Sequence, residues 1–202
     1  MSMDKKEHVS KNKLLNQSEE KNKTRLCASL ESFRSVALGF IAVFAMLYFF
    51  GFTVVVGQSM EPTFHEGDIV FMQTVGNTYQ KGDCIVFAHS YDNGNGGHLI
   101  KRIAAVAGDT VDCDLETSEL FVNGESLFVP DIPIDPDEIT EFPLVVPAGY
   151  VFAVGDNYNH SMDSRYKSVG LVSEKDITGK VKIQLTKGKL PIIVKNTAEE
   201  EP

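Results

Sequence analysis

An uncharged apolar run from Val36 to Val56 constrains this chain more than any other feature of its sequence. It reads VALGFIAVFAMLYFF and continues through GFTVVV, which makes 21 residues without a charged side chain. About 20 apolar residues, rising ~1.5 Å each in an α-helix, cross the ~30 Å hydrocarbon core of a bilayer. A buried helix of a soluble domain would carry a polar stripe, and this run has none. The sequence therefore predicts one transmembrane helix over residues 36–56.

The residues before this run favour an uncleaved anchor over a removable export signal. Val43 and Ala45 fit the small-residue positions of a signal-peptide cleavage site. However, a polar head of 35 residues precedes the run, and apolar residues continue beyond Ala45. Residues 1–35 are rich in Lys, Glu, Asn and Ser and contain few large apolar groups, so we expect a flexible tail there.

The charges on the two sides of the run predict its orientation. Four basic residues lie close before it: Lys21, Lys23, Arg25 and Arg34. The first basic residue after it is Lys81. Because cytoplasmic flanks are enriched in Lys and Arg, we expect a single-pass protein of the cell membrane with residues 1–35 in the cytoplasm and the rest outside.

The acidic balance of the chain excludes one class of partner. The first 35 residues carry eight Lys or Arg and five Asp or Glu, whereas the remainder carries eleven and twenty-three. Nucleic-acid binding draws its affinity from basic side chains that neutralise phosphates. We therefore expect no nucleic acid as a partner.

Residues 57–190 show the pattern of a mainly β domain. Short segments rich in Val, Ile and Phe are separated by Gly, Asn and Asp: DIVFMQ, DCIVFAH, HLIKRIAAV, ELFVNG, GYVFAVG and GKVKIQL. Strands of this length between turn residues predict an antiparallel β-sandwich or barrel. We expect a hairpin tip at residues 93–97, a proline-rich surface loop at 130–143 and a C-terminal tail at 191–202.

The three cysteines carry no metal or redox signature. Cys27, Cys84 and Cys113 cannot all pair within one chain, and they lack the short spacings of a metal site. We expect small, partly buried residues, with a bridge between Cys84 and Cys113 left open because its geometry cannot be tested from sequence. No metal and no cofactor are expected.

Two residues suggest catalytic chemistry. Ser59 follows the apolar run within VVVGQSMEPTF, and a serine nucleophile needs a base. Lys101 lies in HLIKRIAAV, where a strand would place it on one face with Leu99 and Ile103. Loss of solvent around an amine on such a face lowers its pKa towards neutrality, which makes it a usable base.

A third segment, GDNYNHSMDSRYKSVGLV at 155–172, brings further polar groups. In an extended chain Ser161, Asp163 and Arg165 would project to the same side. Asp163 and Arg165 could then form an ion pair that supports a site.

Five motifs together resemble the type I signal peptidases of bacteria. In chain order they are SMEPT at 59–63, GDIV at 67–70, KGDCIVF at 81–87, KRIAAVAGD at 101–109 and GDNYNHSMDSR at 155–165. Their order and spacing match the family over most of residues 36–182, and the single anchor resembles its compact members. The resemblance implies a membrane-anchored serine endopeptidase that removes signal peptides from exported preproteins. It also implies a preference for small residues in the cleaved peptide.

The same resemblance implies roles for individual residues. Ser59 would be the nucleophile and Lys101 the general base, and the backbone N–H of Ser59 would bind the oxyanion. Ser161 would orient the Lys101 amine. Gly57 stands where some relatives carry a second hydroxyl donor, so that contribution is expected to be absent or made by backbone.

The remaining expected roles are supporting ones. Asp163 and Arg165, with Arg102 nearby, would hold the last motif in place, and Met60 would shield the catalytic pair from water. This sequence departs from the pattern of the family it resembles at Ala105, Ala107 and Tyr158, and Gly170 is displaced by a couple of residues from the family's usual position.

Three alternatives compete with this interpretation. A Ser-His-Asp hydrolase would use one of four histidines: His65, His89, His98 and His160. A self-cleaving repressor shares the serine-lysine chemistry but carries a DNA-binding head. A non-catalytic β domain would require Ser59 and Lys101 to lie apart. The preferred preproteins and the oligomeric state are not determined by the sequence.

Overall fold

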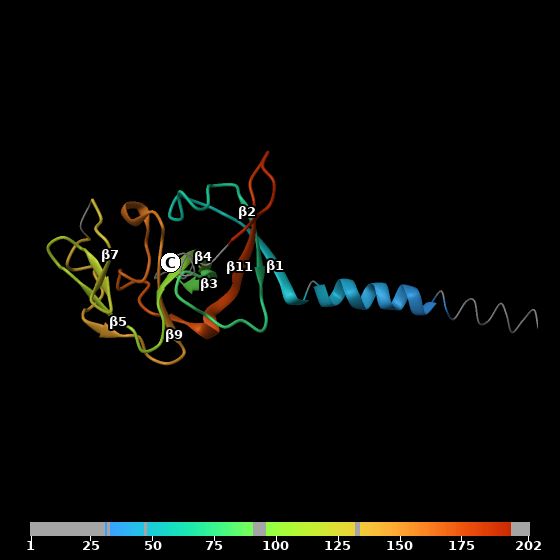
Figure 1. Ribbon diagram of the computed structural model, residues 1–202, viewed down its shortest axis with the longest axis horizontal. Helices are drawn as coiled ribbons and strands as arrows, with labels where there is room; N and C mark the ends of the chain where they lie inside the picture. The colour runs from blue at the N-terminus through green and yellow to red at the C-terminus, as the bar shows by residue number, and fades with distance from the viewer. Residues whose placement is uncertain (1–30, 32, 47, 91–95, 132–133, 195–202) are drawn as a thin grey trace, which may run out of the picture. The chain divides into compact units, whose positions relative to one another are not determined.

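The computed structural model describes residues 31, 33–46, 48–90, 96–131 and 134–194, and it divides the chain into two compact units (Figure 1). The first unit is Met1–Leu47, in which residues 33–46 are helical and expose apolar side chains such as Phe40 and Phe44. Within the described ranges, no helix is both long enough and apolar enough to span a membrane. Most of the expected polar tail lies outside the described residues.

The helix predicted for residues 36–56 does not continue to Val56. Strand β1 (Phe50–Val54) replaces its last part and pairs antiparallel with β2 (Ile69–Gln73), with Phe52 opposite Phe71. The prediction was wrong here because a short, wholly apolar strand and a buried helix have the same composition. Thr53 and the three valines after it are β-branched and favour a strand.

The second unit, Tyr48–Pro202, is built from antiparallel strands. After β1 and β2 come β3 (Cys84–Ser90), β4 (Gly96–Ala105), β5 (Thr110–Cys113), β6 (Leu120–Val122), β7 (Glu125–Phe128), β8 (Leu144–Val145), β9 (Tyr150–Val154), β10 (Val172–Ser173), β11 (Ile177–Leu185) and β12 (Ile192–Ile193). Two 3₁₀ turns, η1 (Tyr158–His160) and η2 (Glu174–Asp176), lie between them. The predicted mainly β, antiparallel class is confirmed.

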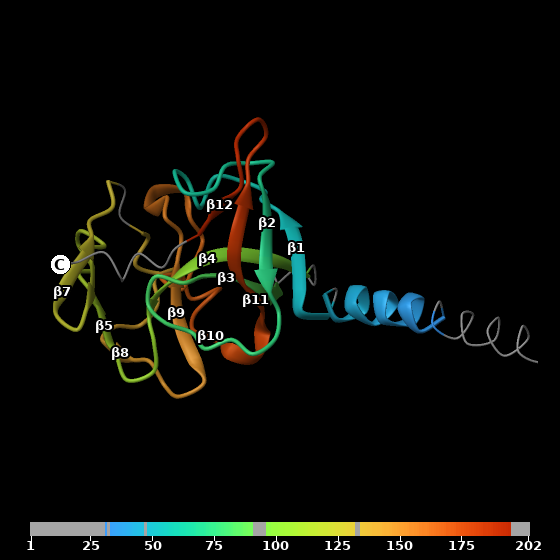
Figure 2. The same cartoon turned by 45° about the vertical axis from the view of Figure 1, so that its right-hand side comes forward.

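The strands form two sheets. The 8-stranded sheet has the order β1-β2-β11-β3-β4-β9-β10, with β12 on β11, and the 4-stranded sheet has the order β7-β6-β5-β8 (Figures 1 and 2). The expected tail from residue 191 begins later, since Ile192–Ile193 pair with β11. The expected hairpin tip falls mainly on residues 91–95, which are outside the described part, and the flanking β3 and β4 pair antiparallel.

Among the described residues of this unit, three apolar clusters form the core. One lies among β1, β2, β3 and β11 and includes Met60 and Phe64 from the segment between β1 and β2. A second lies around β3, β4 and β9, and a third packs the small sheet against the end of β9. Cys84 and Cys113 are free thiols in different clusters, so the bridge left open by the sequence is not formed. The segment after β1 is therefore fixed by its own buried side chains.

Candidate active site

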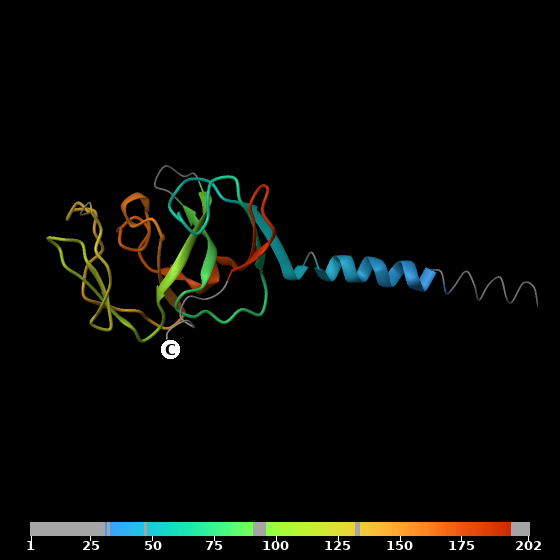
Figure 3. The same ribbon diagram turned by 45° about the horizontal axis from the view of Figure 1, so that its top comes forward.

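Ser59 and Lys101 lie in direct contact. Lys101 projects from β4 opposite Ile85 of β3, and its Nζ donates a hydrogen bond of 2.6 Å to Ser59 Oγ. The two residues are 42 positions apart in the chain. Antiparallel pairing brings β4 into the large sheet (Figure 3). The hydrogen bond with Lys101 shows that the turn after β1 carries Ser59 to this strand.

The surroundings of Lys101 lower the pKa of its amine. Its side chain is 2% exposed. The pKa of the Lys101 amine is lowered to about 8, chiefly by this burial; the Asp163 and Asp156 carboxylates act to raise it, and the charge of Arg165 acts to lower it. At pH 7 roughly one amine in ten is then neutral, which is enough to supply a general base.

Backbone contacts fix the position of Ser59. The N–H of Asn157 donates to Ser59 O at 3.0 Å, and the Asn157 side chain donates to Gln58 O at 3.1 Å. Gly57, with φ of +83°, turns the chain in the left-handed region that disfavours side chains. Within the described part of the chain, no hydrogen bond is donated by the Ser59 N–H. That donor remains available to a bound group.

Ser161 lies close to Ser59 but does not contact the amine as expected. A Cβ placed on Gly155 would collide with Ser161 Oγ and with Ser59 O, so Gly155 permits this close approach. Ser161 is buried, and its Oγ has no hydrogen-bond partner among the described residues. The Lys101 amine is instead directed to Ser59, and the hydrogen bond that the resemblance implied from Ser161 is not formed.

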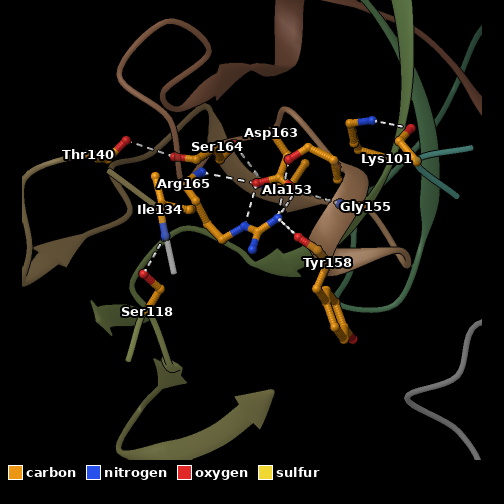
Figure 4. Close-up of polar contacts among 12 residues, drawn as sticks. Lys101, Ser118, Ile134, Thr140, Ala153, Gly155, Tyr158, Asp163, Ser164 and Arg165 are labelled. Atoms are coloured by element: carbon orange, nitrogen blue, oxygen red, sulfur yellow. Dashed lines mark hydrogen bonds and ion pairs between the residues drawn. The ribbon is translucent and has the colours of Figure 1, made fainter. Parts of the chain in front are cut away.

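Asp163 and Arg165 form a buried ion pair, which occupies the centre of Figure 4. Arg165 Nε and Nη2 donate to the two carboxylate oxygens at 2.8 and 2.9 Å. Asp163 also accepts the Gly155 N–H at 2.9 Å, and Arg165 Nη2 donates to Tyr158 O at 2.9 Å. The guanidinium lies over the ring of Phe128, 5.1 Å from its centroid. The pair thus shapes the turn beside Ser59.

Arg102 belongs to a separate ion pair. It projects from β4 next to Lys101 but binds Asp156, with Nε–Oδ1 at 2.8 Å and Nη2–Oδ2 at 2.6 Å. Thr63 Oγ1 donates to the same carboxylate at 2.5 Å. Burial alone would lower the pKa of Arg102, but the hydrogen bonds that Arg102 donates to the Asp156 carboxylate hold that pKa above its usual range. This second pair connects β4 to the segment that follows Ser59.

Comparisons with known proteins place this site in a family. The family model described as "Signal peptidase, peptidase S26" matches residues 29–186. The chain belongs to the signal peptidase family. A "Signal peptidase I" of Bacillus amyloliquefaciens is 30% identical over 175 residues, 80% of this chain and 90% of the relative. The "Signal peptidase I S" of Bacillus subtilis (strain 168) is 32% identical over 153 residues, 69% of this chain and 78% of the relative.

A solved structure is also similar to this signal peptidase. The crystal structure of a signal peptidase I from Enterococcus faecalis V583 matches with a TM-score of 0.36 and 28% identity, covering 51% of this chain and 96% of that one. The resemblance inferred from the five motifs is confirmed by the family match. Membership makes the chain a serine peptidase.

Met60 and the histidines take different places around the site of this signal peptidase. Met60, the residue after Ser59, is buried in the same apolar cluster as Phe64. His65, His98 and His160 are exposed, and Ser59 Oγ is bonded to Lys101 rather than to an imidazole. Within the described ranges, no group of three or more His, Cys, Asp or Glu is placed to hold a metal ion.

Sequence reasoning missed Asp156 and Thr63 as partners of Arg102. It grouped Arg102 with Asp163 and Arg165, although these form their own pair. Alternation along β4 offered a signal, since Arg102 and Lys101 must face opposite sides of the sheet. A cation on the second face needs a carboxylate of its own.

Proposed function

We propose that this signal peptidase is a membrane-anchored endopeptidase that removes N-terminal signal peptides from exported preproteins, with Ser59 as nucleophile and Lys101 as general base. The observation that carries the proposal is the 2.6 Å hydrogen bond between a buried lysine amine and a serine hydroxyl. The alternative of a non-catalytic domain requires these groups to be out of reach of each other, and their contact argues against it.

The geometry supports a two-step acyl transfer. Neutral Lys101 Nζ accepts the Ser59 Oγ proton as the oxygen attacks the scissile carbonyl, and the resulting ammonium donates that proton to the leaving amine. Lys101 is then neutral again; it takes a proton from the water that attacks the ester and returns that proton to Ser59 Oγ as the acyl group leaves. The amine needs no carboxylate partner for this cycle, because it must release its proton within each turnover.

The developing oxyanion would be held by backbone. The Ser59 N–H is not used within the described part of the protein, so it can donate to the tetrahedral intermediate. Gly57 offers no side-chain hydroxyl. Ser161 Oγ is buried, lies close to Ser59 O and has no hydrogen-bond partner among the described residues; we expect it to help orient the Lys101 amine.

The apolar run would anchor the protein in the cell membrane with its N-terminus in the cytoplasm. Its helical part is shortened by β1, and an exposed apolar row continues across the sheet, where Phe52 pairs with Phe71, Phe71 with Ile183 and Ile183 with Ile193. Phe52 and Ile193 are highly exposed. Because β1 lies in the last part of the apolar run, this row fits contact with lipid.

Cleavage of a preprotein by the purified full-length protein tests the proposal. We expect Ser59→Ala and Lys101→Ala each to reduce kcat by at least about a thousandfold, because each removes one half of the nucleophile-base unit. Ser168→Ala, at an exposed serine, serves as the matched control and should leave the rate unchanged. Wild-type activity in either of the first two variants would refute the assignment.

A further inference from the structure

A buried glutamine on β11 binds the segment that carries Ser59. Residues 59–68 are called the nucleophile loop below. Gln184 Nε2 donates to the backbone oxygen of Thr63 at 3.1 Å and to Asp68 Oδ2 at 2.7 Å. It also lies 3.2 Å from Thr186 Oγ1 on its own strand. Gln184 is 7% exposed, so these bonds form away from water.

A β-bulge at Lys182 turns Gln184 inwards. Val181 pairs with Met72, and Ile183 pairs with the next residue of β2, Phe71, so Lys182 is the extra residue. Val181 is buried, and regular alternation would bury Ile183 as well, yet Ile183 is 38% exposed and Gln184 is buried opposite Val70. Bulges re-aim side chains in this way. Without the bulge, the amide would face solvent and an isoleucine would take its place.

The bulge itself is held by the end of the described chain. The N–H of Val194 donates to Lys182 O at 2.9 Å, and β12 pairs with β11 at Ile183 and Gln184. The carbonyl that the bulge leaves unpaired is therefore satisfied by Val194, directly after β12.

Gln184 completes the attachment of the nucleophile loop. At its start, Asn157 N–H binds Ser59 O. In its middle, Thr63 Oγ1 binds Asp156. At its end, Asp68 accepts the His65 N–H at 2.9 Å besides the Gln184 amide. Gln184 is thus the contact from β11 that joins the middle of the loop to its end.

The buried carboxylate of Asp68 depends on these donors. Burial by itself raises the pKa of Asp68, but hydrogen bonds from the His65 backbone and the Gln184 amide hold that pKa below its usual range. Removing the amide would leave a buried charge and the Thr63 carbonyl short of a donor, and the loop would have to shift to reach water. Ser59, four residues before Thr63, would shift with it.

We propose that Gln184 is a positioning residue for the peptidase reaction, which fixes the nucleophile loop so that Ser59 Oγ stays within reach of Lys101. The inference rests on the proposed roles of Ser59 and Lys101. It also gives the bulge at Lys182 a role, because the bulge turns the Gln184 amide towards the nucleophile loop.

The test compares full-length variants on one preprotein substrate, well below each variant's unfolding midpoint. Because a displacement of about 1 Å can cost a hundredfold in rate, Gln184→Leu should lower kcat by about tenfold to a hundredfold. KM should change by less than about twofold, because the contact acts on the reacting group. Gln73→Leu is the matched control, since Gln73, the last residue of the neighbouring β2, donates to Val75 O beyond the end of that strand, and the variant should keep wild-type kcat.

Exchange of the two partners provides a rescue. Gln184→Glu sets a second carboxylate against Asp68 and should lower kcat at least as much as Gln184→Leu. Adding Asp68→Asn restores an amide-carboxylate hydrogen bond between positions 184 and 68 with the roles reversed. The Thr63 carbonyl stays without its donor, so kcat should recover only in part, by about fivefold. A purely structural role would move the unfolding midpoint alone.

The outcomes distinguish the positioning role of Gln184 from the catalytic roles of Ser59 and Lys101. Wild-type kcat in folded Gln184→Leu, a change confined to KM, or equal kcat in Gln184→Glu and its double variant would each overturn the positioning role. If Gln184→Leu does not fold, the comparison of Gln184→Glu with its double variant decides. Ser59→Ala run in parallel tests the proposed function, because activity there would overturn the nucleophile whatever Gln184 does.

Discussion

Lys101 and Arg102 are neighbours on β4 and face opposite sides of the sheet. Their surroundings shift the pKa values of the two cations in opposite directions. Arg102 meets the Asp156 carboxylate in a two-point ion pair, and its pKa is raised. Lys101 meets a serine hydroxyl, and burial brings its pKa down to about 8. Arg165, also buried, has Asp163 directly against it. A cation in an ion pair with a carboxylate supports the structure. Lys101, which forms no such ion pair within the described residues, can exchange its proton.

The largest expected effect comes from making the charge on Lys101 permanent. Lys101→Arg keeps a cation beside Ser59 but cannot release its proton near neutral pH, so we expect kcat to fall by about 10³-fold or more. Single-turnover cleavage measures this. Lys187→Arg, at an exposed lysine, is the control. Substantial turnover in Lys101→Arg would mean that the amine acts only as a charge.

A large loss of stability is expected when the buried ion pair between Asp163 and Arg165 is broken. Asp163→Asn removes the charge that balances Arg165, which is 0% exposed, and should lower the free energy of unfolding by about 3 kcal/mol. Denaturant unfolding of the full-length protein measures the loss. Asp137→Asn, at an exposed carboxylate, should change it by less than about 0.5 kcal/mol. Equal effects would show that the buried pair is not a support.

A somewhat smaller effect should appear in the pH dependence of stability. Between about pH 8 and the unfolded-state pKa of 10.5, the unfolded chain holds a proton on Lys101 that the folded chain has released, so stability rises with pH. The rise due to this group is at most about 3 kcal/mol. Lys101→Met should remove it, and the variant should be the more stable form near pH 7. Parallel curves for both proteins would contradict a lowered pKa.

A structural feature of this protein can be predicted from the sequence when residues close together in the chain determine it. Alternation placed Lys101 on the face with Leu99 and Ile103, and turn residues separated the strands, because both patterns are local. Arg102 found Asp156, 54 residues away, which no local pattern specifies. The motifs brought Ser59 and Lys101 together only through resemblance to a family.

The helix predicted to Val56 and the overlooked Gln184 have one cause, because both depend on how neighbouring strands pair. The apolar run to Val56 contains a strand because pairing with β2 decides between helix and strand there. Gln184 was overlooked because regular alternation from Val181 sends it to solvent, and a single bulged residue reverses that. Pairing between strands is a property of the folded sheet, and one residue of slip changes every side chain after it.

The pH profile of kcat/KM for preprotein cleavage tests the central claim most directly, because it reports the ionisation of the base in the free enzyme. With the pKa of Lys101 near 8, the rate should be level above that pH and fall about tenfold for each pH unit below it. A profile that stays level down to about pH 5, or a limb near the ordinary lysine value of 10.5, would contradict a base created by burial without a carboxylate partner.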